Sequence, residues 1–154
     1  MLCVGLCACN TQQNSGASPS INEPPLTQKT QTMKNLISIV EIPVSDFPRA
    51  VKFYKDLFGV QIEEMEMGGV TMGVLPADDG SVSVVLAKGD DYKPTTHGAV
   101  LYLKAGEDLQ PMLDRVKQHG GQIIVAKTEI SAEMGYFALF IDSEGNKLGL
   151  HSSK

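Results

Sequence analysis

Several classes of protein are excluded by what this sequence lacks. Its three cysteines, Cys3, Cys7 and Cys9, all lie in the first nine residues, so the rest of the chain can form no disulfide and no cysteine metal site. No apolar run reaches the roughly 18 residues that a membrane-spanning helix needs. The formal net charge is −5 and the 13 Lys and Arg residues are scattered. A nucleic-acid partner is excluded, because neutralising phosphates needs a clustered basic surface.

What is present is the composition of an ordinary globular domain. The chain has 154 residues, of which 42% are hydrophobic and 20% charged. This balance predicts one domain with a sizeable core.

The first 34 residues differ from the rest of the chain. The segment Leu6-Cys7-Ala8-Cys9 resembles the lipobox of bacterial lipoproteins, which implies a leader over residues 1–9, lipidation at Cys9 and a membrane anchor facing the periplasm. Residues 10–34 are polar and predict a flexible tether. No Lys or Arg precedes Lys29, so a working signal peptide would need further residues upstream. The alternative is a cytoplasmic protein whose translation starts at Met33.

Residues 35–88 contain one strand, one helix and three further strands in that order. Residues 36–44 alternate as a strand does, and an apolar stripe with helical spacing begins after Asp46 and ends at Gly59. Three more strands are predicted over residues 60–67, 69–75 and 81–87.

The same order returns about sixty residues later. A strand is predicted over 97–104, a helix over 108–119, and strands over 122–129, 135–142 and 147–152. The fold class is therefore α+β, with two tandem βαβββ modules (35–88 and 97–152) in one domain over 35–152.

Three segments are the most telling: Glu41-Ile42-Pro43-Val44-Ser45-Asp46, Arg49-Ala50-Val51-Lys52-Phe53-Tyr54 with Phe58-Gly59, and the closing residues 135–146, which end in Asp142-Ser143-Glu144-Gly145-Asn146. With them the sequence resembles the vicinal oxygen chelate superfamily, which includes glyoxalase I, bleomycin-resistance proteins and extradiol dioxygenases. The resemblance covers residues 35–151. The sequence is most similar to a glyoxalase-related subgroup without an assigned reaction. The resemblance implies that the modules form a curved mixed sheet around a cleft that holds a small molecule, and that homodimers complete or bury this cleft.

Metal-dependent members of this superfamily place one His, Glu or Gln in each of four strands. Carried over to this chain, the first position falls on Ile39 and the last near Gly149, and neither side chain can bind a metal. The fourth strand, residues 81–87, offers no carboxylate or imidazole. His97 alone matches, at the third position. We therefore expect no cofactor, and a divalent metal at His97 is the disfavoured alternative.

Another set of polar residues could still serve the cleft. Glu41 shares a strand face with Ile39, and His151 shares one with Gly149. Glu41 and His97 are therefore the candidate catalytic pair, as general acid and base on a carbonyl substrate. The candidate ligand-binding residues are Ile39, Met72, Tyr92 and His151. The plainer interpretation is a hydrogen-bonded Glu41, a strand-capping His97 and a solvated His151.

Three functions are compatible with these residues. The first is a glyoxalase-like lyase or isomerase that transforms a small carbonyl or hydroxy compound without metal. The second is a non-catalytic binder resembling the bleomycin-resistance branch, which the apolar residues at the metal positions favour. The third is a metal-dependent lactoylglutathione lyase or dioxygenase, and the missing ligands argue against it.

Overall fold

The computed structural model describes residues 35–154, so the predicted leader, tether and Cys9 lipidation site lie outside the described residues. Contacts group residues 33–154 in one unit. In the part of the chain that is described, no helix is long and apolar enough to span a membrane. The elements in chain order are β1 (Ile39–Pro43), α1 (Phe47–Phe58), β2 (Glu63–Met67), β3 (Val70–Val74), β4 (Ser83–Lys88), β5 (Tyr102–Lys104), α2 (Gln110–Gln118), β6 (Gln122–Ser131), β7 (Gly135–Ile141) and β8 (Lys147–Ser152).

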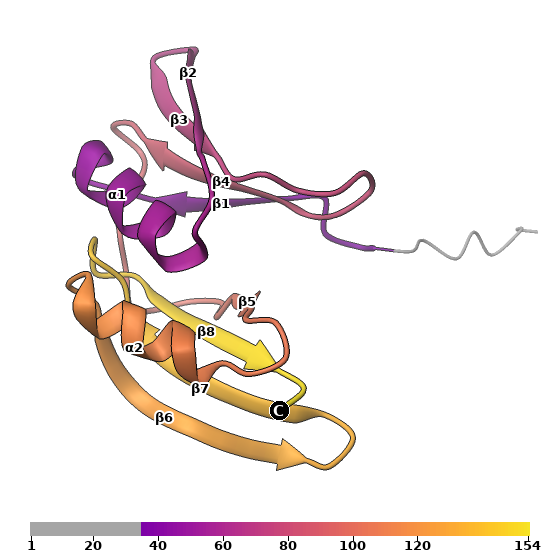
Figure 1. Cartoon of the computed structure of the whole chain (residues 1–154). Helices are drawn as coiled ribbons and strands as arrows, with labels where there is room; N and C mark the ends of the chain where they lie inside the picture. The colour runs from indigo at the N-terminus through magenta and orange to yellow at the C-terminus, as the bar shows by residue number, and fades with distance from the viewer. Residues whose placement is uncertain (1–34) are drawn as a thin grey trace, which may run out of the picture. The chain divides into compact units, whose positions relative to one another are not determined.

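Both modules have the predicted βαβββ order and the same strand arrangement (Figure 1). The first forms a four-stranded sheet in the order β1-β4-β3-β2, here called sheet A, and the second forms sheet B in the order β5-β8-β7-β6. In each sheet the first strand pairs in parallel with the last strand of its module, and the other pairs are antiparallel. The α+β class is confirmed, as two separate four-stranded mixed sheets.

Helix α1 has clear start and stop signals. The Asp46 side chain accepts a hydrogen bond from the Arg49 amide (3.1 Å), and a proline lies in the first turn. The helix ends at Gly59, whose φ of 67° lies in the left-handed region that glycine adopts without steric cost. Both predicted ends are therefore confirmed.

The strand predicted over 97–104 is wrong at its amino-terminal end, since β5 starts only at Tyr102. The Lys147 amide donates to the Thr95 carbonyl, whereas the Gly149 amide, two residues on, donates to the Leu101 carbonyl. The segment between these two carbonyls is longer than its partner on β8 and loops out of the ladder. Gly98, with φ of 103°, lies in this loop.

One hydrophobic core joins the two modules. It contains Ile42 and Leu86 from sheet A, Leu103 and Leu150 from sheet B, and the apolar stripes of α1 and α2. The helices pack against each other, α1 also against β4 and α2 also against β6. The cross-module contact at the centre is a hydrogen bond from the buried Tyr54 hydroxyl to Asp142 Oδ2 (2.7 Å). Burial first, and then the Asp142 charge, raise the pKa of Tyr54 well above its usual value.

The β7–β8 turn holds the start of α1. Glu144 Oε2 accepts hydrogen bonds from the amides of Ser45 (3.0 Å) and Asp46 (2.8 Å), and Glu144 Oε1 accepts one from Arg49 Nε (2.8 Å). Burial raises the pKa of this carboxyl, but the Arg49 and backbone hydrogen bonds outweigh it and lower the pKa to about 2. An anion thus lies at the helix amino terminus, where the helix dipole favours it.

The other end of α1 is also held by the second module, because Arg115 Nη1 donates to the Leu57 carbonyl (3.0 Å). Both ends of α1 are therefore satisfied by groups from residues 97–152, and this fixes the two sheets with respect to each other.

Candidate functional site

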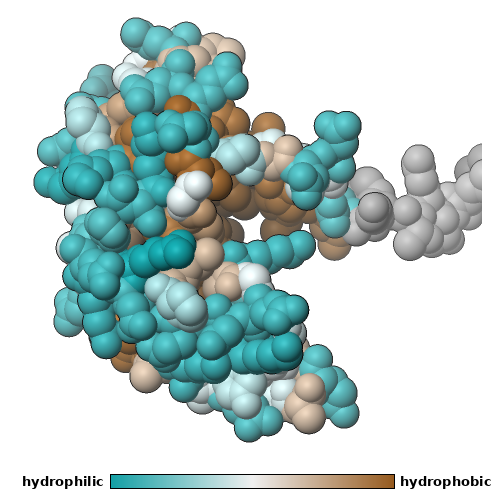
Figure 2. All heavy atoms as spheres, in the orientation of Figure 1, coloured by the Kyte–Doolittle hydropathy of each residue, from teal (hydrophilic) through white to brown (hydrophobic). Residues whose placement is uncertain are grey.

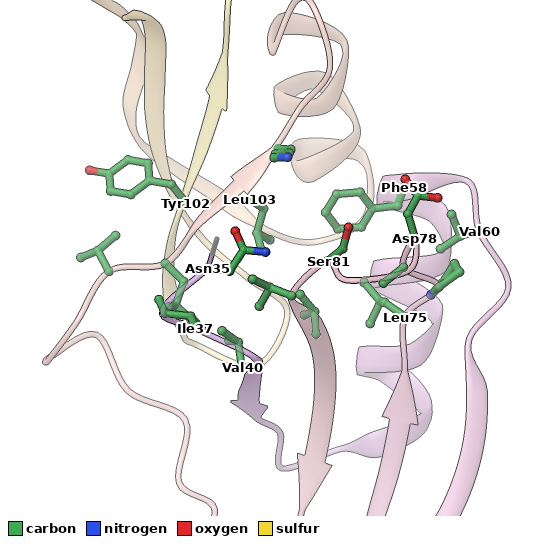
Figure 3. Close-up of a pocket in the computed structure, with 17 residues that line it drawn as sticks. Asn35, Ile37, Val40, Phe58, Val60, Leu75, Asp78, Ser81, Tyr102 and Leu103 are labelled. Carbon is green, nitrogen blue, oxygen red and sulfur yellow. The ribbon is translucent and has the colours of Figure 1, made fainter. Parts of the chain in front are cut away.

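A cavity of about 750 Å³ lies between the two modules (Figure 3). In the space-filling view, the hollow between them is bordered by brown, hydrophobic atoms (Figure 2). Its walls come from β1, the end of α1, the β3–β4 loop, β4 and β5. The apolar lining includes Val40, Phe58, Val60, Leu75, Val84, Leu101 and Leu103, and the polar lining includes Asn35, Asp78, Ser81 and Lys104.

The cavity lies mostly on the faces of the sheets that carry the helices. Val40 and Val84 have the same strand parity as Ile42 and Leu86, which pack against the helices in the core. The predicted site residues Ile39 and Glu41 have the opposite parity and point to the other face of sheet A, here called its outer face. None of the candidate catalytic or ligand-binding residues named from the sequence lines the cavity.

Two of the predicted residues do meet on the outer face of sheet A. The Tyr92 hydroxyl, from the connector between the modules, donates a hydrogen bond to Glu41 Oε2 (2.7 Å). This bond raises the pKa of Tyr92. The Tyr92 ring packs close above Gly89, where an added Cβ would lie 3.2 Å from it. Met72 shares this outer face, because it pairs with Ala87, which lies two residues after Val85, the partner of Glu41, and so on the same strand face.

The two predicted histidines lie elsewhere. His97 is exposed in the loop before β5, where its amide donates to Thr95 Oγ1 (3.0 Å). His151 lies on β8 and its Nε2 donates to the Met134 carbonyl (2.7 Å). Among residues 35–154, no group of three or more His, Cys, Asp or Glu side chains could hold a metal ion. Glu41, His97 and His151 are therefore not gathered into one site within a single chain.

Because the two modules repeat the same strand arrangement, superposing them identifies the four strand positions at which the family carries its metal ligands. The Val44 amide donates to the Ala87 carbonyl and the Ala105 amide donates to the His151 carbonyl, both at 2.9 Å. Superposing these two bonds brings Val100 onto Ile39 and Gly149 onto Val85.

The four positions are thus Ile39, Val85, Val100 and Gly149, and none of these residues has a side chain that can bind a metal. His97 lies three residues before the third position, so the residues present do not fit the metal site of the family.

An aromatic ring covers the last of these positions. A Cβ added at Gly149 would overlap the Tyr102 ring, which means that the ring lies directly on the Gly149 backbone. Phe137 of β7 meets Tyr102 edge-on, with 6.3 Å between ring centroids. Tyr102 remains 50% exposed. Sheet B therefore presents an aromatic surface where the family places its fourth metal ligand.

Sequence reasoning missed Tyr102 and Phe137. Strand alternation could have identified Tyr102, because Tyr102 alternates with the buried Leu103. Tyr102 therefore lies on the same strand face as Val100, the third metal position. The misplaced start of the fifth strand hid it.

The outer faces also carry exposed apolar side chains. Ile39 is 61% and Met67 63% exposed on sheet A, and Met65 and Ile37 lie on the same strands or just before them. Exposed apolar side chains on a sheet face favour contact with another molecule.

Residues 36–150 match the family model described as Glyoxalase/Bleomycin resistance protein/Dioxygenase superfamily. A glyoxylase-like domain-containing protein from Didymella fabae is 29% identical over 115 residues, which cover 71% of this chain and 88% of that protein.

Solved structures share the fold. A glyoxalase I variant from Zea mays superposes with a TM-score of 0.60 at 21% identity, covering 75% of this chain but only 46% of that one. TnmS3, an antibiotic-binding protein from Streptomyces sp. CB03234, superposes with a TM-score of 0.59 at 21% identity, covering 78% of this chain and 97% of that one. The chain thus spans about half the length of the maize enzyme and nearly the full length of the antibiotic-binding protein.

Proposed function

Because the chain belongs to the Glyoxalase/Bleomycin resistance protein/Dioxygenase superfamily, we propose that it binds a small organic molecule without metal, on the outer faces of its sheets. The main observation in support is that the Tyr102 ring lies on the backbone of Gly149, the fourth metal position, and covers it. Ile39, Val85 and Val100 at the other three positions support the same proposal.

The ligand is a small compound with an apolar or aromatic part and a hydroxyl or carbonyl group. Tyr102 and Phe137 offer ring faces and edges to its apolar part. Glu41 and Tyr92 are the polar pair that recognises its oxygen: Glu41 accepts a hydrogen bond from a ligand hydroxyl, and Tyr92 donates to a ligand carbonyl when its single proton turns from Glu41 to the ligand.

The ligand site is completed by a second copy of the chain. Glu41 lies on sheet A and Tyr102 on sheet B, and each outer face points away from the shared core, so one chain cannot bring them together. In a homodimer, sheet A of one protomer faces sheet B of its partner, which covers Ile39 and Met67.

The test is a thermal-shift screen of small hydroxy and carbonyl compounds on full-length protein, with and without EDTA. We expect a compound that raises the unfolding midpoint equally in both conditions, because binding to the native state stabilises it by mass action. Its effect should be lost in Tyr102→Ala and retained in the matched control Tyr102→Phe, which keeps the ring. Stoichiometric tightly bound metal, or a ligand response abolished by EDTA, would overturn the proposal.

A second candidate function is supported by the Glu41–Tyr92 hydrogen bond at 2.7 Å. A carboxylate bonded to a phenol can move a proton at a carbonyl compound, as a metal-free lyase or isomerase requires. Turnover of a bound hydroxy-carbonyl compound that disappears in Glu41→Gln, with the thermal shift retained, supports catalysis. Binding without turnover in the wild-type protein contradicts catalysis and supports the non-catalytic binding function.

A further inference from the structure

The cavity between the modules differs from the proposed ligand site in position and in chemistry. Val40, Val84 and Leu103 line the cavity from the helix-bearing faces of the sheets, whereas Glu41, Tyr92 and Met72 lie on the outer face of sheet A and do not line it; Tyr102 borders both sites. The cavity volume of about 750 Å³ falls within the range of roughly 300–1,000 Å³ that small-molecule pockets occupy.

The walls of the cavity are apolar and come from both modules. Val40 and Val84 of sheet A and Leu103 of sheet B line it, with Phe58 and Val60 at the carboxyl end of α1. Water in contact with these side chains is unfavourable, so a ligand that displaces it gains free energy in proportion to the apolar area covered.

Oxygen atoms mark one side of the cavity. Asp78 and Ser81 belong to the same turn, in which the Ser81 amide donates to the Asp78 carbonyl (2.9 Å). Figure 3 shows their side-chain oxygens on the side of Phe58 and Val60, while the Tyr102 ring points away from the cavity. On this side of the cavity a carboxylate and a hydroxyl together favour a ligand that donates hydrogen bonds, and the carboxylate charge disfavours an anion. The cation of the lining, Lys104, comes from β5 in the other module.

Asn35 holds the turn against the start of β1. Its Nδ2 donates to the Gly80 carbonyl (2.9 Å), across 45 residues of sequence. The turn that carries Asp78 and Ser81 is therefore tied to a second wall of the cavity, which limits the motion of the polar side.

We propose that this cavity is a second binding site, which takes an apolar molecule ending in a hydrogen-bond donor such as a primary amine or an alcohol. The apolar body lies among the valine and leucine side chains, and the donor meets Asp78 and Ser81. The proposal does not rest on the outer-face ligand site, because Asp78 and Ser81, which recognise the donor, belong to the cavity alone, and Tyr102 is the one ligand-site residue that also borders the cavity.

Three probes with one apolar body and different end groups test it: 4-phenylbutylamine, 4-phenylbutan-1-ol and 4-phenylbutyrate. Titrations of isotope-labelled full-length protein are followed by amide and methyl chemical shifts. We expect the amine and the alcohol to shift Val84, Leu75 and Leu103, and the carboxylate to bind most weakly. Asp78→Asn should lower the affinity for the amine about threefold, as expected for an exposed ion pair, and leave that for the alcohol unchanged.

Matched variants separate the two sites. Val82→Trp fills the cavity, and Ser81→Trp blocks its rim from an exposed position that tolerates a large side chain. Either should abolish the shifts, with the unfolding midpoint reporting that the variant is folded. Val70→Trp adds the same side chain on the outer face of sheet A and should leave cavity binding intact.

Equal binding of all three probes, shifts confined to the outer-face residues, or unchanged binding in both Val82→Trp and Ser81→Trp would overturn the proposal. So would a change of Val82→Trp from dimer to monomer without any probe binding in the wild-type protein, since that result assigns the cavity to a second copy of the chain. Failure of the outer-face ligand screen leaves these outcomes unaffected.

Discussion

At the scale of single residues, Glu144 shows how one side chain can depend on contacts with a distant part of the sequence. Its carboxylate is fully buried, and it accepts hydrogen bonds from Ser45, Asp46 and Arg49 nearly a hundred positions earlier in the chain. The motif around Glu144 was visible in the sequence as part of the family resemblance. Its partners were not, because only the packing of the two modules brings them within reach.

The pKa of Glu144 makes a prediction about pH. The folded-state pKa of about 2 lies below the ordinary value of 4.5, so the carboxylate stabilises the fold above about pH 5, and this contribution disappears as the pH falls towards 2. In urea unfolding, Glu144→Gln should lose on the order of 3 kcal/mol at pH 7 and almost nothing at pH 2.

The exposed Glu64→Gln on β2 is the control and should unfold like the wild type at every pH. A wild-type advantage over Glu144→Gln that is the same at pH 7 and pH 2 would show that shape, and not charge, explains the effect of Glu144.

The candidate site residues illustrate the same limit of sequence reasoning. Glu41 and Tyr92 were both named from the sequence, and they form a hydrogen bond (2.7 Å). The pattern of neighbouring residues predicts that His97 lies in a strand. In the structure it lies in a loop before β5, outside the hydrogen-bonded pairing of β5 with β8. Such loops depend on pairing with β8, which sequence pattern alone does not report.

At the scale of the element, the helices and antiparallel strands follow their sequence signals closely. α1 begins after Asp46 and ends at Gly59, because capping and glycine conformation are local properties. The short β5 does not follow them. Three residues carry too little alternation to distinguish a strand from the connector that precedes it.

The end of α1 allows a test of local backbone strain. Gly59 has φ of 67° and no atom within 4 Å of an added Cβ, so Gly59→Ala introduces strain without a steric clash. We expect a loss of about 1 kcal/mol in the free energy of unfolding, measured by chemical denaturation. Gly59→Asn should lose less, because asparagine tolerates this conformation better. Equal stability of Gly59→Ala and the wild type would contradict the left-handed cap.

At the scale of the whole molecule, we expect a second protomer to cover the exposed apolar residues of the sheets. The proposed homodimer should dissociate when a charge is placed in its contact, because an uncompensated charge cannot be buried there. Ile39→Glu, at a 61% exposed outer-face position, should therefore sediment as a monomer under conditions where the wild type is a dimer.

Lys117→Glu, on the exposed surface of α2, is the matched control and should remain dimeric. A wild-type protein that sediments as a monomer at all concentrations would contradict the homodimer and the composite ligand site with it.

The sequence by itself determined the two βαβββ modules, the ends of α1 and the absence of metal-binding side chains at Ile39 and Gly149. These follow from periodicity, capping and residue chemistry, which act over a few neighbouring residues. Only the tertiary structure decided that Tyr102 covers Gly149, that Glu144 accepts hydrogen bonds from the residues just before α1 and that a cavity opens between the modules. Each of these joins residues far apart in the chain, and their meeting depends on how the modules pack around one shared core.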